Sequence, residues 1–209
     1  MRTRAKSSGK TRAKSSAKTG VSSHGGAGRN ASKTASPTSN SDNSDLSNFV
    51  GLALKFGARE AKVIHAATVE CETWVRLKCQ FGCGGYAKRL TCPPLTPTPE
   101  ETAAVVACYK RAILIHCRDN DIVNDIIPRL EREVFLAGYY KALGFGSGPC
   151  HLCDRCDVTG RCVHPDSARP SMEACGIDVY ATAHANRFPI HVVRSRREEG
   201  DYYGLVLVD

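Results

Sequence analysis

The sequence contains no run of about eighteen apolar residues, which is the length that a transmembrane helix needs. No apolar signal-peptide core follows the N-terminal charges either. We therefore expect a cytoplasmic protein with no membrane partner, in a reducing compartment where disulfide bonds are disfavoured. The Walker, Rossmann and G-x-S-x-G motifs are also absent, so the sequence lacks these common signatures of nucleotide-binding proteins and hydrolases.

Cysteine, by contrast, is abundant, with eleven in a chain of 209 residues. An odd number of thiols cannot pair completely. In a reducing compartment, clustered cysteines more often bind a metal or carry out redox chemistry. Disulfides are therefore the weakest explanation of the cysteine content.

Most of the positive charge lies in the first 45 residues. They carry nine Lys and Arg residues against Asp42 and Asp45, so the rest of the chain is nearly neutral although the formal net charge is +8. Val21 is the only bulky aliphatic residue before Leu46. Such a segment cannot bury enough surface to offset its ordering entropy, which predicts a disordered basic tail over residues 1–45. A solubilising role is the simplest interpretation, and weak contact with a polyanion or nucleic acid is the alternative.

Residues 46–209 are predicted to form one α+β domain with a mixed sheet, flanking helices and two cysteine-rich metal-binding loops. One helix has a clear start signal, with Thr98 as N-cap, Pro99 at the first position and Glu101 closing a capping box. Other helices are expected over 48–60, 122–137 and 170–186, and strands over 62–69, 112–115, 190–193 and 203–208, the last two forming a C-terminal hairpin.

The more distinctive loop has the spacing C-x2-C-x2-C-x5-C, formed by Cys150, Cys153, Cys156 and Cys162. Thiolates three positions apart on a turning loop converge on one centre, and the first three positions match the cysteine run of bacterial ferredoxins. The fourth position departs from that run, so Cys162 could complete this site or belong to another one. Structural zinc is the competing interpretation, but zinc sites normally separate their two cysteine pairs by a longer spacer. The spacing favours a 4Fe–4S cluster over zinc.

The second loop contains Cys79, Cys83 and Cys92 among glycines and prolines. Lys and Arg residues nearby would offset the negative charge of thiolates. Three ligands leave one position open, to be filled by Cys71, Cys162, Cys175 or a non-protein ligand. The alternative is a structural loop whose cysteines bind nothing.

Several landmarks occur together in one order: RLKC at Arg76–Cys79, the Cys92-Pro93-Pro94 run, TPTPEE at Thr96–Glu101, GYYKALGFGSGPC at Gly138–Cys150, and ARPSMEACGIDV at Ala168–Val179. The combination resembles a family of prokaryotic predicted metal-binding proteins of unknown function, over roughly residues 48–209. The resemblance implies metal binding through the seven cysteines of the two loops. It implies no reaction, and it does not include Cys175.

Together these features predict a metal-binding protein, with an iron–sulfur protein in electron transfer as the leading hypothesis and an unidentified redox protein as its partner. We expect one cluster, and two if the loop with Cys79, Cys83 and Cys92 also holds one. The alternatives are a structural zinc protein or adaptor, and a metalloenzyme with an open site at Cys79, Cys83 and Cys92.

Overall fold

The computed structural model of the protein describes residues 44–195 and 197–209. The basic tail predicted over residues 1–45 lies outside this range, except for its last two positions. In the described chain, the sheet has four strands: β1 (Glu60–His65), β2 (Arg111–Cys117), β3 (Leu143–Phe145) and β4 (Tyr202–Leu207). Five α-helices accompany them: α1 (Ser47–Lys55), α2 (Thr73–Gly82), α3 (Pro99–Val106), α4 (Asn120–Leu136) and α5 (Val179–Ala185). The predicted α+β class is confirmed.

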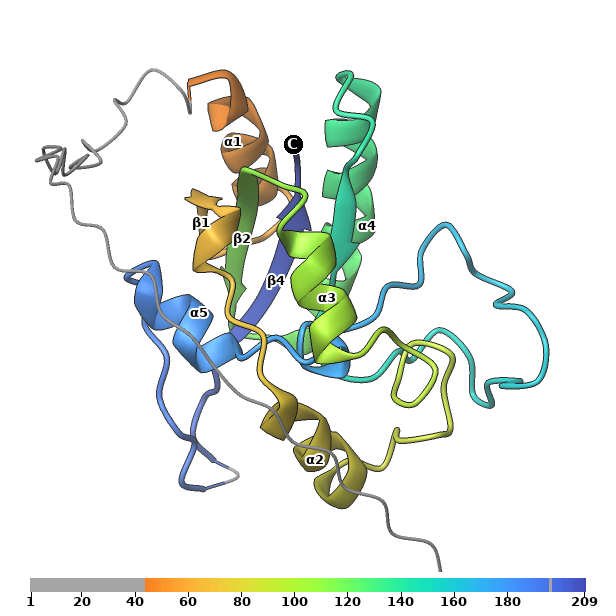
Figure 1. Cartoon of the computed structure of the whole chain (residues 1–209). Helices are drawn as coiled ribbons and strands as arrows, with labels where there is room; N and C mark the ends of the chain where they lie inside the picture. The colour runs from red at the N-terminus through yellow and green to blue at the C-terminus, as the bar shows by residue number, and fades with distance from the viewer. Residues whose placement is uncertain (1–43, 196) are drawn as a thin grey trace, which may run out of the picture. The chain divides into compact units, whose positions relative to one another are not determined.

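The strand order is β1-β2-β4-β3, and every neighbouring pair is antiparallel. The prediction of a mixed sheet is therefore wrong. Strands β2 and β3, which α4 connects, do run in the same direction. They are not neighbours, however, because β4 from the end of the chain inserts between them and pairs with both (Figure 1).

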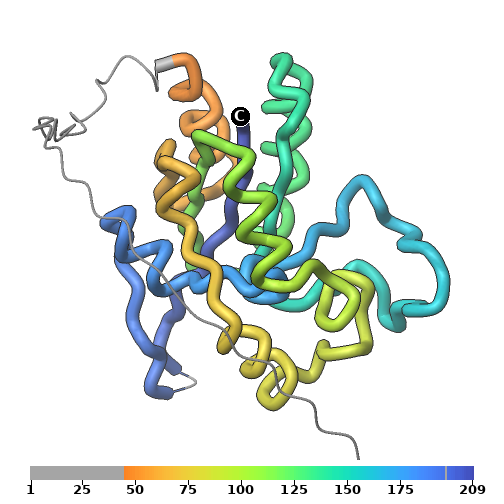
Figure 2. The backbone as a smooth tube through the Cα atoms, viewed as in Figure 1, coloured from red at the N-terminus to blue at the C-terminus, as the bar shows by residue number. Residues whose placement is uncertain are grey.

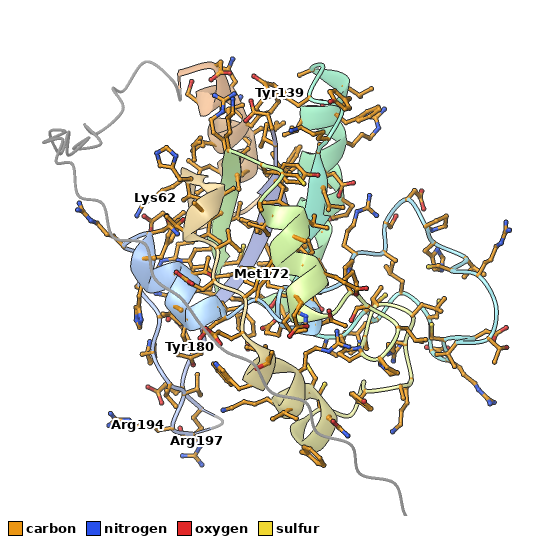
Figure 3. The ribbon with its side chains drawn as sticks, viewed as in Figure 1. Lys62, Tyr139, Met172, Tyr180, Arg194 and Arg197 are labelled. Atoms are coloured by element: carbon orange, nitrogen blue, oxygen red, sulfur yellow. The ribbon has the colours of Figure 1, made fainter. Side chains whose placement is uncertain are left out.

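Helices α1 and α4 cover one face of the sheet, where α1 packs on β1 and α4 on β2, in one core with Ile113 and Ile115. The alternate residues of the same strand, Ala112 and Leu114, face a second core built from α3, α5 and the segment around Met172 (Figure 3). Both faces of β2 are thus fully buried. Burying one such Leu or Ile stabilises the fold by about 1.5–3 kcal/mol, so the central strands are fixed by packing on two sides.

The predicted C-terminal hairpin is wrong. Strand β4 exists over nearly the predicted residues, but it lies in the middle of the sheet, and the segment 190–193 lies outside the four strands of the described chain. The side chains explain the difference. Leu205, Val206 and Leu207 are all fully buried, so β4 needs cover on both faces, whereas Val192 is 68% exposed.

Local start and stop signals decide several other boundaries. The capping box at Thr98 and Glu101 is present, and α3 begins at Pro99 as predicted. The helix predicted over 170–186 is instead split into a short 3-10 turn, η3 (Glu173–Cys175), and α5. Gly176 adopts a left-handed conformation between them with φ +81, which ends η3. Two further 3-10 turns have three residues each: η1 (Ser44–Leu46) precedes α1, and η2 (Ala66–Thr68) follows β1.

Helix α2 and the two cysteine-rich segments lie at the end of the sheet where β3 ends and β4 begins. In chain order, the first segment contains Cys79, Cys83 and Cys92, and the second contains Cys150, Cys153, Cys156 and Cys162. Figures 1 and 2 show the yellow-green segment after α2 beside the cyan segment after β3. Within the described residues, no helix is both long and apolar enough to cross a membrane.

Candidate metal centre

The first cysteine-rich segment starts on a helix rather than in a loop. Cys79 lies in the last turn of α2, and Cys83 caps the C-terminus of this helix, with its N–H 3.3 Å from the Cys79 carbonyl oxygen. Cys83 acts on the pKa of Cys79, so its thiol lies near that of Cys79 although its own backbone is extended. Cys92, further along the loop, is 4% exposed.

Gly85 marks the point where two of these sulfurs converge. A Cβ atom at this position would lie 3.1 Å from Cys92 Sγ and 3.6 Å from Cys83 Sγ. Its backbone N–H also donates a hydrogen bond to Cys83 Sγ at 3.4 Å. The missing side chain therefore leaves a small space bordered by two thiols and an N–H donor.

Burial disfavours the charged thiolate form of two of these cysteines, Cys79 and Cys92. Burial, followed by the neighbouring Cys83, Glu173 and Cys92, raises the pKa of Cys79 to about 11. Burial is also the main cause that raises the pKa of Cys92. Both thiols are therefore protonated near neutral pH in the metal-free protein, and binding a metal ion would release these protons.

The second cysteine-rich segment brings its own four thiols near one another. Partial burial, then the neighbouring Cys156, Cys150 and Cys162, raise the pKa of the Cys153 thiol. That Cys162 shares one metal site with the other three cysteines stays a prediction. All four cysteines are partly exposed, since the segment lies at the surface.

The two segments contact each other directly. The Leu90 N–H donates a hydrogen bond to Cys156 Sγ at 3.4 Å, and Arg89 Nη1 donates to the Cys153 carbonyl oxygen at 2.9 Å. Cys150 also acts on the pKa of Cys92. Cys156 and Cys150 of the second segment thus both act on the first one, and Cys150 joins Cys162 as a candidate for the additional ligand there. Cys175, another predicted candidate ligand, is fully buried in the core. Burial raises the pKa of its thiol, and the neighbouring Cys71 and Cys79 raise it further.

The side chains do not yet enclose a metal ion. Over residues 44–195 and 197–209, no group of three or more His, Cys, Asp or Glu side chains is placed so that it could hold one. The donor chemistry nevertheless fits a soft metal, because thiolates select zinc, copper(I) and iron–sulfur clusters. The space at Gly85 and the sulfur-directed N–H groups of Gly85 and Leu90 suit charged thiolates.

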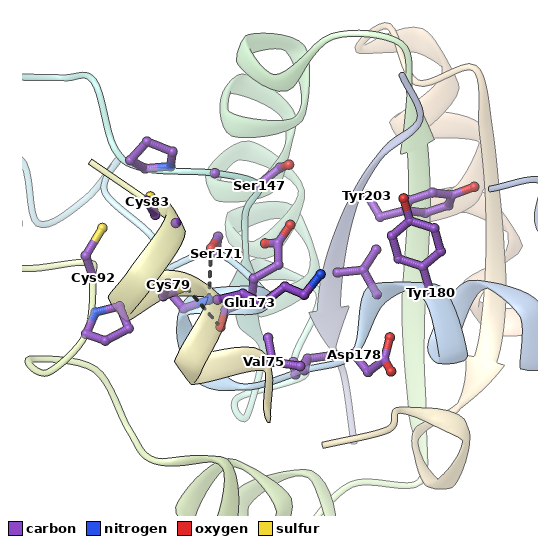
Figure 4. Close-up of a pocket in the computed structure, with 18 of the residues that line it drawn as sticks. Val75, Cys79, Cys83, Cys92, Ser147, Ser171, Glu173, Asp178, Tyr180 and Tyr203 are labelled. Carbon is purple, nitrogen blue, oxygen red and sulfur yellow. Dashed lines mark hydrogen bonds between the residues drawn. The ribbon is translucent and has the colours of Figure 1, made fainter. Parts of the chain in front are cut away.

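A cavity of about 830 Å³ lies against Cys79, Cys83 and Cys92 (Figure 4). Glu173 of η3 also lines this cavity, and burial raises the pKa of its carboxyl group. Sequence reasoning missed both features. Glu173 was visible only as a lone acidic residue in the otherwise apolar stretch MEACGI.

Arg76 holds this region together. Its Nη1 atom donates to the carbonyl oxygens of Pro97 at 2.6 Å and Ala174 at 3.2 Å, and to Thr96 Oγ1 at 3.2 Å. One guanidinium thus ties α2 to the segment before α3 and to η3. Its position in the RLKC landmark is the signal that the sequence offered.

The fold and the site define an α+β domain that carries two adjoining cysteine-rich segments. The chain belongs to the family described as "Predicted metal-binding protein (DUF2284)", whose model matches residues 62–208. This match confirms the predicted family resemblance and supports metal binding as the general property. No curated protein matches the chain. No solved structure matches it either.

Proposed function

We propose that the protein is an iron–sulfur protein, with a 4Fe–4S cluster held by Cys150, Cys153, Cys156 and Cys162. The observation that carries this proposal is the hydrogen bond from the Leu90 N–H to Cys156 Sγ, with Arg89 on the same segment. Amide hydrogen bonds to sulfur and nearby positive charge are the means by which proteins stabilise the negative charge of a thiolate cluster. The short middle spacing of the four cysteines supports a cluster over zinc.

A bound cluster would supply one-electron oxidation and reduction. The residues of the chain would hold it and set its surroundings. Arg89 and Leu90 would fix the position of the segment, and the partly exposed cysteines leave an approach for a redox protein as partner. An electron-transfer role follows from this exposure.

A second candidate function is a metalloenzyme with an open site at Cys79, Cys83 and Cys92. The observation that favours it is the cavity, because all three thiols line it. Three protein ligands with one free position are typical of catalytic metals. The two functions are compatible, since each uses a different segment.

The test is anaerobic purification of the full chain, followed by quantitation of iron, acid-labile sulfide and zinc and by visible spectroscopy. We expect iron and sulfide in similar amounts and the broad absorption of thiolate-to-iron charge transfer. The Cys156→Ser variant should lose most of it. The Cys108→Ser variant is the matched control, because Cys108 is exposed and lies outside both segments. A colourless protein with stoichiometric zinc would instead identify a structural zinc protein.

A further inference from the structure

Several of the residues that line the cavity beside Cys79 are aromatic, and they come from separate parts of the chain. Trp74 and Phe81 come from α2, Tyr86 from the following loop, Tyr180 from α5 and Tyr203 from β4. Its volume of about 830 Å³ is within the range of sites for small organic molecules. Figure 4 shows Tyr180 and Tyr203 at the opposite end from Cys83 and Cys92.

The charged groups of this cavity are mostly engaged elsewhere. Asp178 caps α5 by accepting a hydrogen bond from the Ala181 N–H at 3.0 Å. Asp201 lies 2.8 Å from His116 Nε2 and 3.0 Å from His191 Nδ1. Lys78 is the one Lys or Arg among the lining residues of the described chain, and its Nζ lies 5.6 Å from the centre of the Trp74 ring.

Glu173 is different. Its Oε2 atom is shielded from solvent and has no hydrogen-bond partner within the described residues. A buried acceptor without a donor costs about 1–3 kcal/mol, so a ligand that brings a donor recovers this free energy. Ser171 and the Gly148 backbone act on the pKa of this carboxyl group, and both also line the cavity.

We propose that this cavity binds a planar aromatic molecule that carries N–H donors and no phosphate or carboxylate group. Its ring lies against the aromatic walls, and its N–H groups donate to the Glu173 carboxyl. Asp178 and Asp201 against Lys78 make the lining net negative even when Glu173 is not counted, which disfavours an anion. The bound molecule would lie beside Cys79, whose Sγ is 3.9 Å from the Glu173 carbonyl oxygen. This binding site goes beyond the proposed redox function and does not depend on which metal the thiols bind.

The test uses the full chain and two probes with the same ring, benzamidine and benzoate, in calorimetric titrations. Benzamidine should bind, and benzoate should bind at least about tenfold more weakly, as expected from a hydrogen bond to a charged group. Trp74 is the single tryptophan of the sequence, so a change in tryptophan emission places the probe in this cavity. Glu173→Gln should weaken benzamidine binding about tenfold or more. Glu100→Gln, an exposed residue of α3, should leave it unchanged.

Equal binding of both probes, or benzamidine binding that Glu173→Gln leaves intact, would overturn the proposal. Heat of binding without any change in Trp74 emission would overturn it as well, because the probe would then lie elsewhere. If Glu173→Gln does not fold, Tyr180→Leu serves instead, since it removes one aromatic wall and should also weaken binding. Iron and sulfide measured in the same samples keep the two proposals separate: a cluster without benzamidine binding refutes only the cavity site.

Discussion

The Leu90 N–H donates a hydrogen bond to Cys156 Sγ, and these residues are 66 positions apart in the chain. The adjacent Arg89 donates to the Cys153 carbonyl oxygen. The first cysteine-rich segment therefore supplies both an amide donor and a positive charge to the second one. The two segments form one structural unit, so a substitution in one segment is expected to affect the other.

Replacing Arg89 by Met should make the midpoint potential of the proposed cluster more negative and speed the loss of its iron to a chelator. The reduced cluster carries more negative charge, and removing a nearby cation destabilises it. Potentiometric titration measures the first effect. Lys88→Met is the matched control, because Lys88 has the same charge but is exposed. If both variants shift the potential equally, the contact with Cys153 has no special role.

Replacing Gly204 by Ala should destabilise the fold by about 1–3 kcal/mol, because a methyl group there overpacks the core. Its Cβ would lie 2.7 Å from Val123 Cγ1 and 2.8 Å from Ile127 Cδ1, where β4 meets α4. Chemical denaturation measures the change. Gly51 in α1 provides the opposite case, since no described atom lies within 4 Å of a Cβ added there. Gly51→Ala should therefore stabilise the protein by roughly 0.5–1 kcal/mol.

The carboxylate of Asp45 should make stability depend on acid pH. Arg111 and the Tyr139 hydroxyl donate hydrogen bonds to it, and in that order they hold its pKa below the ordinary value of 3.8. A lowered pKa contributes stability above the ordinary value, and this contribution is lost as the pH falls through the folded-state pKa. The free energy of unfolding should thus be higher for the wild type than for Asp45→Asn at neutral pH, by less than about 1 kcal/mol because the pair is exposed. Denaturation at several pH values checks this, and a difference that stays constant down to pH about 2 would contradict it.

How far the sequence could predict the structure depended on how local each signal was. The start of α3 and the buried strand β2 follow from neighbouring residues, namely the Thr98 capping box and the apolar run at Ala112–Ile115. The position of β4 does not, since an apolar strand fits either an edge hairpin or the centre of a sheet. Only its packing between α4 and the second core decides the matter.

The candidate site shows the same difference between features set by neighbouring residues and features set by long-range contacts. Spacing alone predicted which cysteines belong to each segment. It could not predict that the Arg89 and Leu90 region would contact Cys153 and Cys156, because these contacts depend on how the two loops fold back at one end of the sheet. Nor could it reveal Glu173 beside Cys79, since the contact joins α2 to a turn 94 residues away.

Gly85 and Gly84 offer a sharp comparison within the first segment. A Cβ at position 85 would lie 3.1 Å from Cys92 Sγ and 3.2 Å from Pro149 Cβ. Gly85→Ala should therefore crowd the thiols and lower the metal content of the purified protein. Metal quantitation and thermal unfolding, measured on the same preparation, separate this effect from a general loss of stability.

Gly84→Ala should leave the metal content unchanged, because no described atom lies within 4 Å of a Cβ added at that position. Both substitutions stiffen the loop in the same way, so the difference between them isolates the contact with sulfur. Equal metal loss in both variants would show that loop flexibility controls uptake. Full metal content in Gly85→Ala would mean that the space between Cys83 and Cys92 is not used, and that the metal is held by the Cys150–Cys162 segment alone.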